Sequence, residues 1–171
     1  MALIINCPNC SSEYVKRLRR ITIYERLLGF FYIYPFCCQL CDRTFRIFQP
    51  GIRYARVDED RREHHRIAVD FPVRLTNAAI QREGQVADLS MSGCTVRLDS
   101  VLPLANLVSV EFQIPGVAGP LTVKTAIVRN SAQDRIGLEF LRFQGDERQR
   151  LRRVIRDLMD RADPSTISSI R

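Results

Sequence analysis

The sequence Asp88-Leu89-Ser90-Met91-Ser92-Gly93 lies between two short segments in which apolar and polar residues alternate. Alternation with a period of two is typical of half-buried β-strands. The same pattern recurs downstream, and the segments are separated by turn signals such as Glu83-Gly84, Ser92-Gly93, Pro115-Gly116 and Ala118-Gly119-Pro120. The predicted strands are Ile67–Thr76, Gln85–Leu89, Cys94–Leu98, Leu107–Ile114, Leu121–Arg129 and Ile136–Phe143. Six short strands joined by short turns indicate a small antiparallel barrel or sandwich.

One helix is predicted after the last strand. Asp146 is a good N-cap residue, and Gln149 follows it by three positions. The apolar residues beyond it recur at helical spacing, at Leu151, Val154, Ile155, Leu158 and Met159. Such a stripe can bury itself against a sheet while the neighbouring arginines stay in solvent.

Length and composition limit the class of protein. The 171 residues, 46% of them hydrophobic, fit one domain with a small second unit and exclude a disordered chain. No apolar run reaches the roughly 20 residues of a membrane span, and the N-terminus does not resemble a secretion signal. We therefore expect a cytoplasmic protein. The formal net charge is +7, and of the 26 basic residues only Lys16 and Lys124 are lysine. This excess favours an anionic partner, although base composition of a genome can produce it too.

The cysteines divide the chain. Five of the six lie in the first 41 residues, and Gln49-Pro50-Gly51 follows as a break. We predict a small domain at residues 1–49, a linker at 50–60, a β-rich domain with its helix at 61–161, and a flexible tail at 162–171.

The N-terminal cysteines form two CxxC pairs, Cys7-Pro8-Asn9-Cys10 and Cys38-Gln39-Leu40-Cys41. Two such turns can supply four thiolates in a tetrahedron, the arrangement that suits a structural Zn²⁺. We assign the metal ligands to Cys7, Cys10, Cys38 and Cys41. Cys37 is then a spare thiol beside a ligand.

This part resembles the zinc-ribbon family. The basic run Lys16–Arg20 and the lead-in Tyr34-Pro35-Phe36 match, whereas Ser11 and Asp42 stand where ribbons usually have glycine after each pair. Both positions favour a positive φ.

Two interpretations of the ribbon stay open. The basic run, with Tyr14 and Tyr24 nearby, could touch nucleic acid. Alternatively, the aromatic residues at 30–32 and Phe36 form core or a protein-docking surface, which is the interpretation we favour.

A second motif pair lies in the β-rich part. Arg62-Glu63-His64-His65-Arg66 fits RxxxR, and Asp88–Gly93 fits [D/N]xSxxG. With the six strands and the closing helix, residues from about 60 to 161 resemble a PilZ domain. The resemblance implies a mainly β fold, a six-stranded antiparallel barrel with a C-terminal helix, that binds the bacterial second messenger cyclic di-GMP.

The motif residues suit that ligand chemically. Arg62 and Arg66 can grip a guanine edge or a phosphate, and Asp88 can accept from guanine N1–H and N2–H₂. We expect Asp88 and Ser90, two residues apart, to share one strand face, so that Ser90 can also bond a base or phosphate. The remaining site residues are Gly93, which permits a tight turn and close approach, and Arg61, which favours two stacked ligand molecules.

Function follows as an expectation. The sequence contains no P-loop, dinucleotide fingerprint, nucleophile elbow or carboxylate pair that would indicate an enzyme. We predict a receptor or adaptor that transmits cyclic di-GMP binding through the RxxxR segment to the zinc ribbon or to a protein partner. The alternatives are a nucleic-acid-binding zinc-ribbon protein and a PilZ-like adaptor that binds protein but no dinucleotide.

Overall fold

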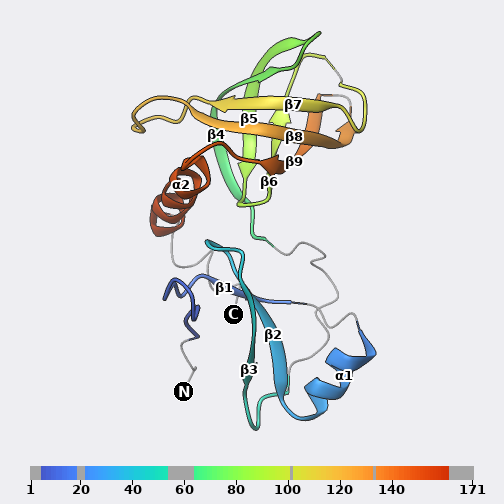
Figure 1. Cartoon of the computed structure of the whole chain (residues 1–171), viewed down its shortest axis with the longest axis vertical. Helices are drawn as coiled ribbons and strands as arrows, with labels where there is room; N and C mark the ends of the chain where they lie inside the picture. Colours follow the sequence, from blue (N-terminus) through green and yellow to red (C-terminus); the bar gives the residue numbers. More distant parts are fainter. Residues whose placement is uncertain (1–4, 19–21, 54–63, 101, 133, 162–171) are drawn as a thin grey trace. The chain divides into compact units, whose positions relative to one another are not determined.

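The computed structural model describes residues 5–18, 22–53, 64–100, 102–132 and 134–161. They form two compact units that meet in the chain between His65 and Arg66, and each is described by itself (Figure 1). The predicted tail at 162–171 and most of the predicted linker lie outside the described residues.

The N-terminal unit is a three-stranded antiparallel sheet with one helix. Its strands lie in the order β1-β2-β3, with helix α1 between β1 and β2 in the chain. The bounds are β1 Val15–Arg17, α1 Ile23–Phe30, β2 Ile33–Cys38 and β3 Thr44–Phe48. The central strand β2 supplies most of the small core, with Tyr34 and Phe36 buried and Phe36 stacked on Phe45.

Helix α1 was not predicted from the sequence. It begins with a capping box, in which the Glu25 amide donates to Thr22 Oγ1 and the Thr22 amide donates to Glu25 Oε2. The signal Thr-x-x-Glu is visible in the sequence, but the helix that follows is only eight residues long and buries none of its residues.

The second unit is a closed six-stranded antiparallel barrel, as predicted. Its strands lie in the order β4-β5-β6-β9-β8-β7. The bounds are β4 Ile67–Thr76, β5 Gln81–Leu89, β6 Gly93–Arg97, β7 Leu107–Phe112, β8 Leu121–Ala132 and β9 Arg135–Arg142. Alternate side chains of these strands fill the interior, as in Phe71, Val73 and Leu75 of β4.

The predicted turn at Glu83-Gly84 is wrong. Gly84 lies inside β5, opposite Val73 of β4. A Cβ on Gly84 would lie 2.4 Å from the Arg97 carbonyl oxygen, so this glycine permits close packing of backbones and does not form a turn. By contrast, Gly116 and Gly119 have the positive φ values that the predicted turns require.

The predicted C-terminal helix is α2, Glu147–Arg161. Leu151, Val154, Ile155 and Met159 are buried, and the helix packs against β4 and β8. Glu147 accepts a hydrogen bond from the Thr122 amide, which fixes the start of the helix to the beginning of β8.

Candidate functional site

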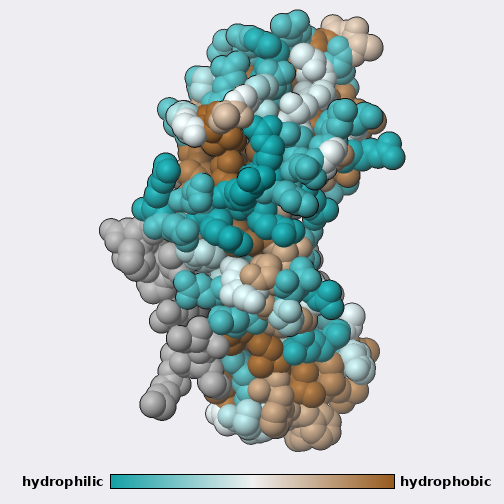
Figure 2. Space-filling model, turned by 60° about the vertical axis from the view of Figure 1, so that its left-hand side comes forward, coloured by the Kyte–Doolittle hydropathy of each residue, from teal (hydrophilic) through white to brown (hydrophobic). Residues whose placement is uncertain are grey.

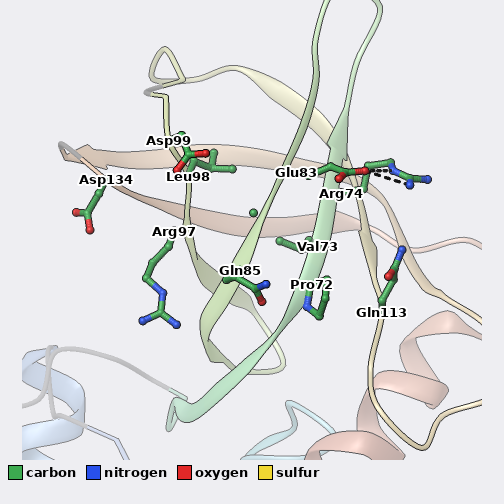
Figure 3. Close-up of a pocket in the computed structure, with 11 residues that line it drawn as sticks. Pro72, Val73, Arg74, Glu83, Gln85, Arg97, Leu98, Asp99, Gln113 and Asp134 are labelled. Carbon is green, nitrogen blue, oxygen red and sulfur yellow. Dashed lines mark hydrogen bonds and ion pairs between the residues drawn. The ribbon is translucent and has the colours of Figure 1, made fainter.

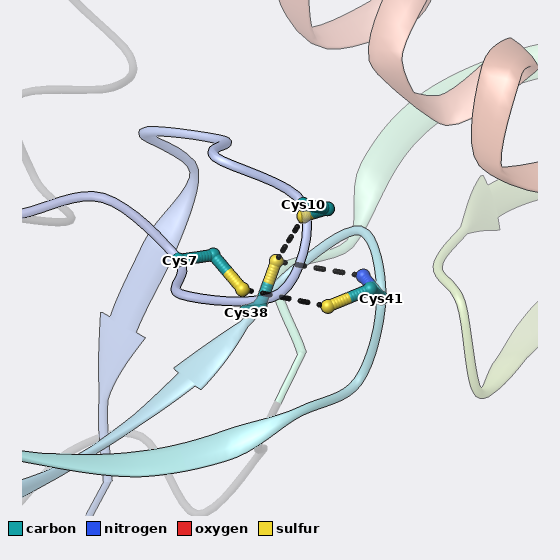
Figure 4. A group of neighbouring side chains, drawn as sticks. All are labelled: Cys7, Cys10, Cys38 and Cys41. Carbon is teal, nitrogen blue, oxygen red and sulfur yellow. Dashed lines mark hydrogen bonds between the residues drawn. The ribbon is translucent and has the colours of Figure 1, made fainter.

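The four predicted ligand cysteines come together in the N-terminal unit. Cys7 and Cys10 precede β1, Cys38 ends β2, and Cys41 lies in the turn toward β3 (Figure 4). The Cys7 and Cys41 sulfurs are 3.5 Å apart, as are those of Cys10 and Cys38. All four sulfur atoms lie within 4.8 Å of one another.

This geometry fits a tetrahedral metal. Zn–S bonds of about 2.3 Å give sulfur–sulfur edges of about 3.8 Å. The backbone also supports the arrangement, because the Asn9 amide donates to Cys7 Sγ and the Cys41 amide to Cys38 Sγ. Ser11 and Asp42 both have positive φ, as predicted for the residues after each pair. The cluster can therefore hold a metal ion of the zinc type.

Burial and hydrogen bonds shift the pKa values of the clustered thiols in different directions. Burial raises the pKa of the Cys38 and Cys10 thiols. Burial acts in the same direction on Cys41, but hydrogen bonds, first from the Asn9 side chain and then from the Arg43 backbone, lower its pKa to about 7. A divalent ion would compensate the cost of holding buried thiolates together.

Cys37 is not one of these four. Cys37 is fully buried. Because side chains alternate between the two faces of a strand, Cys37 lies on the opposite face of β2 from its neighbour Cys38, which is one of the four. Its sulfur lies 4.0 Å from His64 Nε2 and 3.6 Å from the Cys38 carbonyl oxygen. The spare thiol therefore contacts the segment that precedes the barrel.

That segment is attached to the second cysteine turn. His64 is buried, and its Nε2 lies 2.9 Å from Asp42 Oδ1. The His65 amide donates to Gln39 Oε1 at 2.5 Å. Gln39 lies between Cys38 and Cys41 and Asp42 follows Cys41, so both contacts are made by residues of the second cysteine turn.

The next residue, Arg66, belongs to the barrel unit and contacts two of its strands. Arg66 Nη1 lies 2.7 Å from Asp88 Oδ1 and 2.8 Å from Thr95 Oγ1. Asp88 and Thr95 are register partners on β5 and β6. The three side chains are part-buried, and the guanidinium carries further N–H donors on Nε and Nη2.

Ser90 and Gly93 form the turn beside this group. β5 ends at Leu89, so Asp88 and Ser90 do not share a strand, which corrects the expectation from their spacing. The Ser90 hydroxyl is buried and donates to the Gly93 carbonyl oxygen. A Cβ on Gly93 would lie 2.1 Å from the Leu138 carbonyl oxygen, so glycine is required here for close approach to β9.

The structure thus brings together Arg66 and Asp88 and places Ser90 and Gly93 in the adjoining turn. Arg61 and Arg62 lie outside the described residues. Sequence reasoning missed Thr95, although pairing the facing ends of the two predicted strands, Leu89 and Cys94, would have set Thr95 opposite Asp88. Cys94 is fully buried, and burial raises the pKa of its thiol, with the charge of Asp88 adding to the effect.

A cavity of about 430 Å³ opens elsewhere on the barrel, lined chiefly by residues of β4, β5 and β6 (Figure 3). Arg74 contacts Glu83, and Arg97 contacts Asp70 at 2.7 Å. Asp134 also lines the cavity, and of the motif residues that the structure describes, none does. Because both arginines of this lining face carboxylates, the cavity is poorly suited to a ligand with two phosphates.

Comparison with known proteins places these observations in a family context. A family model described as "PilZ domain" matches residues 60–157. A search of the curated proteins finds no significant match.

Solved structures share the fold. The PilZ domain with c-di-GMP of YcgR from Escherichia coli aligns with a TM-score of 0.51 and 18% identity, covering 63% of this chain and 98% of that chain. YcgR in complex with c-di-GMP from Escherichia coli aligns at 0.52 and 16%, covering 91% and 79%. The Bacillus subtilis inhibitor of motility, MotI/DgrA, aligns at 0.52 and 14%, covering 77% and 74%. At these identities the likeness concerns the fold.

Proposed function

The chain belongs to the PilZ domain family, and from this premise we propose that it is a non-enzymatic receptor for cyclic di-GMP. Family membership alone does not establish binding, because function depends on the site. The observation that carries the proposal is the contact of Arg66 with Asp88 and Thr95 beside the turn at Ser90–Gly93. It sets an arginine, a carboxylate and a close-packed turn at one end of the β5–β6 hairpin.

Each group has a role with this ligand. Arg66, through Nε and Nη2, supplies donors to guanine O6 and N7 or to a phosphate. Asp88 accepts from guanine N1–H and N2–H₂, which distinguishes guanine from a phosphate alone. Gly93 lets the start of β6 pack closely on β9, and the Ser90 hydroxyl holds the turn in place beside the ligand position. From the sequence motif we add Arg62 as the second arginine of the pair and Arg61 as a third that favours two stacked ligand molecules.

We further propose that Cys7, Cys10, Cys38 and Cys41 hold a structural Zn²⁺. The four sulfurs lie at distances that suit such an ion, and four thiolates leave no position for a water or substrate. The assignment of residues 1–49 as a zinc ribbon, 50–60 as linker and 61–161 as barrel and helix belongs to the same proposal.

Ligand binding would be transmitted through the RxxxR segment. His64 and His65 contact the second cysteine turn, whereas Arg66 contacts β5 and β6. A ligand that engages Arg62 and Arg66 together favours those states in which both arginines reach it. The readout is then a changed arrangement or exposure of the ribbon toward a protein partner.

Isothermal titration with cyclic di-GMP tests the proposal. Wild type is expected to bind at micromolar concentration or below, and Arg62→Ala, Arg66→Ala and Asp88→Ala to weaken binding by about tenfold or more. Arg97→Ala is the matched control, since Arg97 pairs with Asp70 on the same barrel. Absence of binding by wild type would overturn the proposal, and salt-steep nucleic-acid binding indifferent to Asp88→Ala would favour the alternative.

A further inference from the structure

The N-terminal unit carries an exposed apolar surface that the proposed function does not use. We call it the α1 surface, and it consists of Ile23, Tyr24, Leu27, Phe30, Phe31 and Phe48. These side chains are between 60% and 77% exposed. They are six of the nine large hydrophobic side chains that are exposed within the described residues. Brown and tan side chains gather at the corresponding end of this unit (Figure 2).

Ring contacts and strand register place several members of the α1 surface close to one another. Phe30 and Phe31 pack edge to face, with ring centroids 5.8 Å apart. Phe48 ends β3 opposite Ile33, which closely follows Phe31 in the chain. Arg46 of β3 lies over the Tyr24 ring at 6.0 Å, so the helix adjoins β3.

The helix is held in place without burying an apolar face. Its start is fixed by the capping box of Thr22 and Glu25, and none of its residues is buried. An isolated helix of two turns is marginal in water, and contiguous apolar patches on a protein surface usually mark an interaction site.

The charged residues of the N-terminal unit indicate which kind of partner surface the α1 surface would bind. Residues 1–50 contain seven basic and three acidic residues. Glu25 is the one acidic residue of α1, and its carboxylate is engaged in the cap. Arg26 lies on the helix itself, and Arg46 and Arg53 lie over the rings of Tyr24 and Tyr32. Aromatic, aliphatic and arginine side chains in this combination suit the headgroup region of an anionic bilayer.

We propose that the α1 surface docks the protein on an anionic lipid bilayer. The side chains stand out from the helix and the hairpin end, and such protruding side chains can enter between headgroups. A protein partner would need a groove whose shape matches all six exposed side chains, whereas a lipid bilayer adapts to them. The exposure of these side chains therefore favours a lipid surface. Among the described helices none is both long and apolar enough to cross a membrane. The inference does not depend on dinucleotide binding.

Vesicle co-sedimentation of the full zinc-loaded chain tests this inference. We expect binding to phosphatidylcholine vesicles that contain phosphatidylglycerol, weak binding to phosphatidylcholine alone, and loss of binding at high salt. Leu27→Ser combined with Phe30→Ser should lower the partition coefficient by about tenfold or more. Leu104→Ser is the matched control, because Leu104 is a comparably exposed leucine of the barrel unit.

Variants that remove a positive charge test the electrostatic contribution to bilayer binding. Arg26→Gln and Arg46→Gln should each weaken binding by about fivefold, whereas Arg156→Gln, which removes the same charge from an exposed position on α2, should not. Unchanged metal content shows that the N-terminal unit of each variant is folded. Failure to bind mixed vesicles, or equal binding by the Leu27/Phe30 variant, would overturn the proposal. A concentration-dependent dimer lost in that variant, without vesicle binding, would overturn it in favour of self-association.

Discussion

At the residue scale, two glycines permit close packing of neighbouring strands, a role that the local sequence pattern does not show. Gly84 and Gly93 both follow a polar residue, a combination that is common in turns, and the prediction of a turn at Glu83-Gly84 was wrong. In the structure each lies on a strand whose neighbour's carbonyl oxygen occupies the place of a Cβ. The requirement is set by a strand distant in the sequence, and a local pattern contains no information about that distance.

Gly93→Ala should destabilise the barrel by about 2 to 3 kcal/mol, because its Cβ would overlap the Leu138 backbone. Gly137→Ala on β9 is the control, since the nearest atom to its Cβ would be Asn130 Cβ at 3.4 Å. It should change stability by less than about 1 kcal/mol. Urea unfolding followed by circular dichroism measures both, and equal effects of the two substitutions would refute the close-approach argument.

At the element scale, the six strands and α2 were predictable because burial on one face imposes a period of two or 3.6 on the sequence. Helix α1 was missed because it has only eight residues and buries none of them, so its few apolar positions do not stand out in the sequence. The Arg66–Asp88 contact joins the two sequence motifs. Thr95 was missed because neither sequence motif contains it, and only the pairing of β5 with β6 sets it opposite Asp88.

The two neighbouring cysteines at the end of β2 allow a sharp test of the metal site. Cys38→Ser should abolish stoichiometric zinc and unfold residues 5–53, because a three-stranded sheet has too small a core to fold alone. Cys37→Ala should keep one zinc, since its sulfur contacts His64 and not the four-cysteine group. Metal analysis with amide NMR spectra distinguishes the outcomes, and the barrel resonances should persist in both variants. Loss of zinc in Cys37→Ala would contradict the ligand assignment.

At the scale of the whole molecule, the boundary between the two units falls inside the RxxxR motif. His65 is hydrogen-bonded to the second cysteine turn, and the next residue, Arg66, is hydrogen-bonded to β5 and β6. One peptide bond therefore joins a contact with the cysteine turn to a residue of the proposed ligand site. Any metal-dependent ordering of His64 and His65 restricts the conformations that Arg66 can adopt.

This arrangement predicts reciprocal coupling between zinc and cyclic di-GMP. Removing zinc should change the dinucleotide affinity by about fivefold or more, and bound dinucleotide should change zinc affinity by the same factor. His64→Ala should abolish the coupling, because it removes the side chain that contacts Asp42 and Cys37. His65→Ala should retain it, since the bond to Gln39 comes from the backbone amide. Titration of wild type, His64→Ala and His65→Ala with cyclic di-GMP, each with and without zinc, tests this coupling. If wild type binds cyclic di-GMP with the same affinity with and without zinc, the two units act independently.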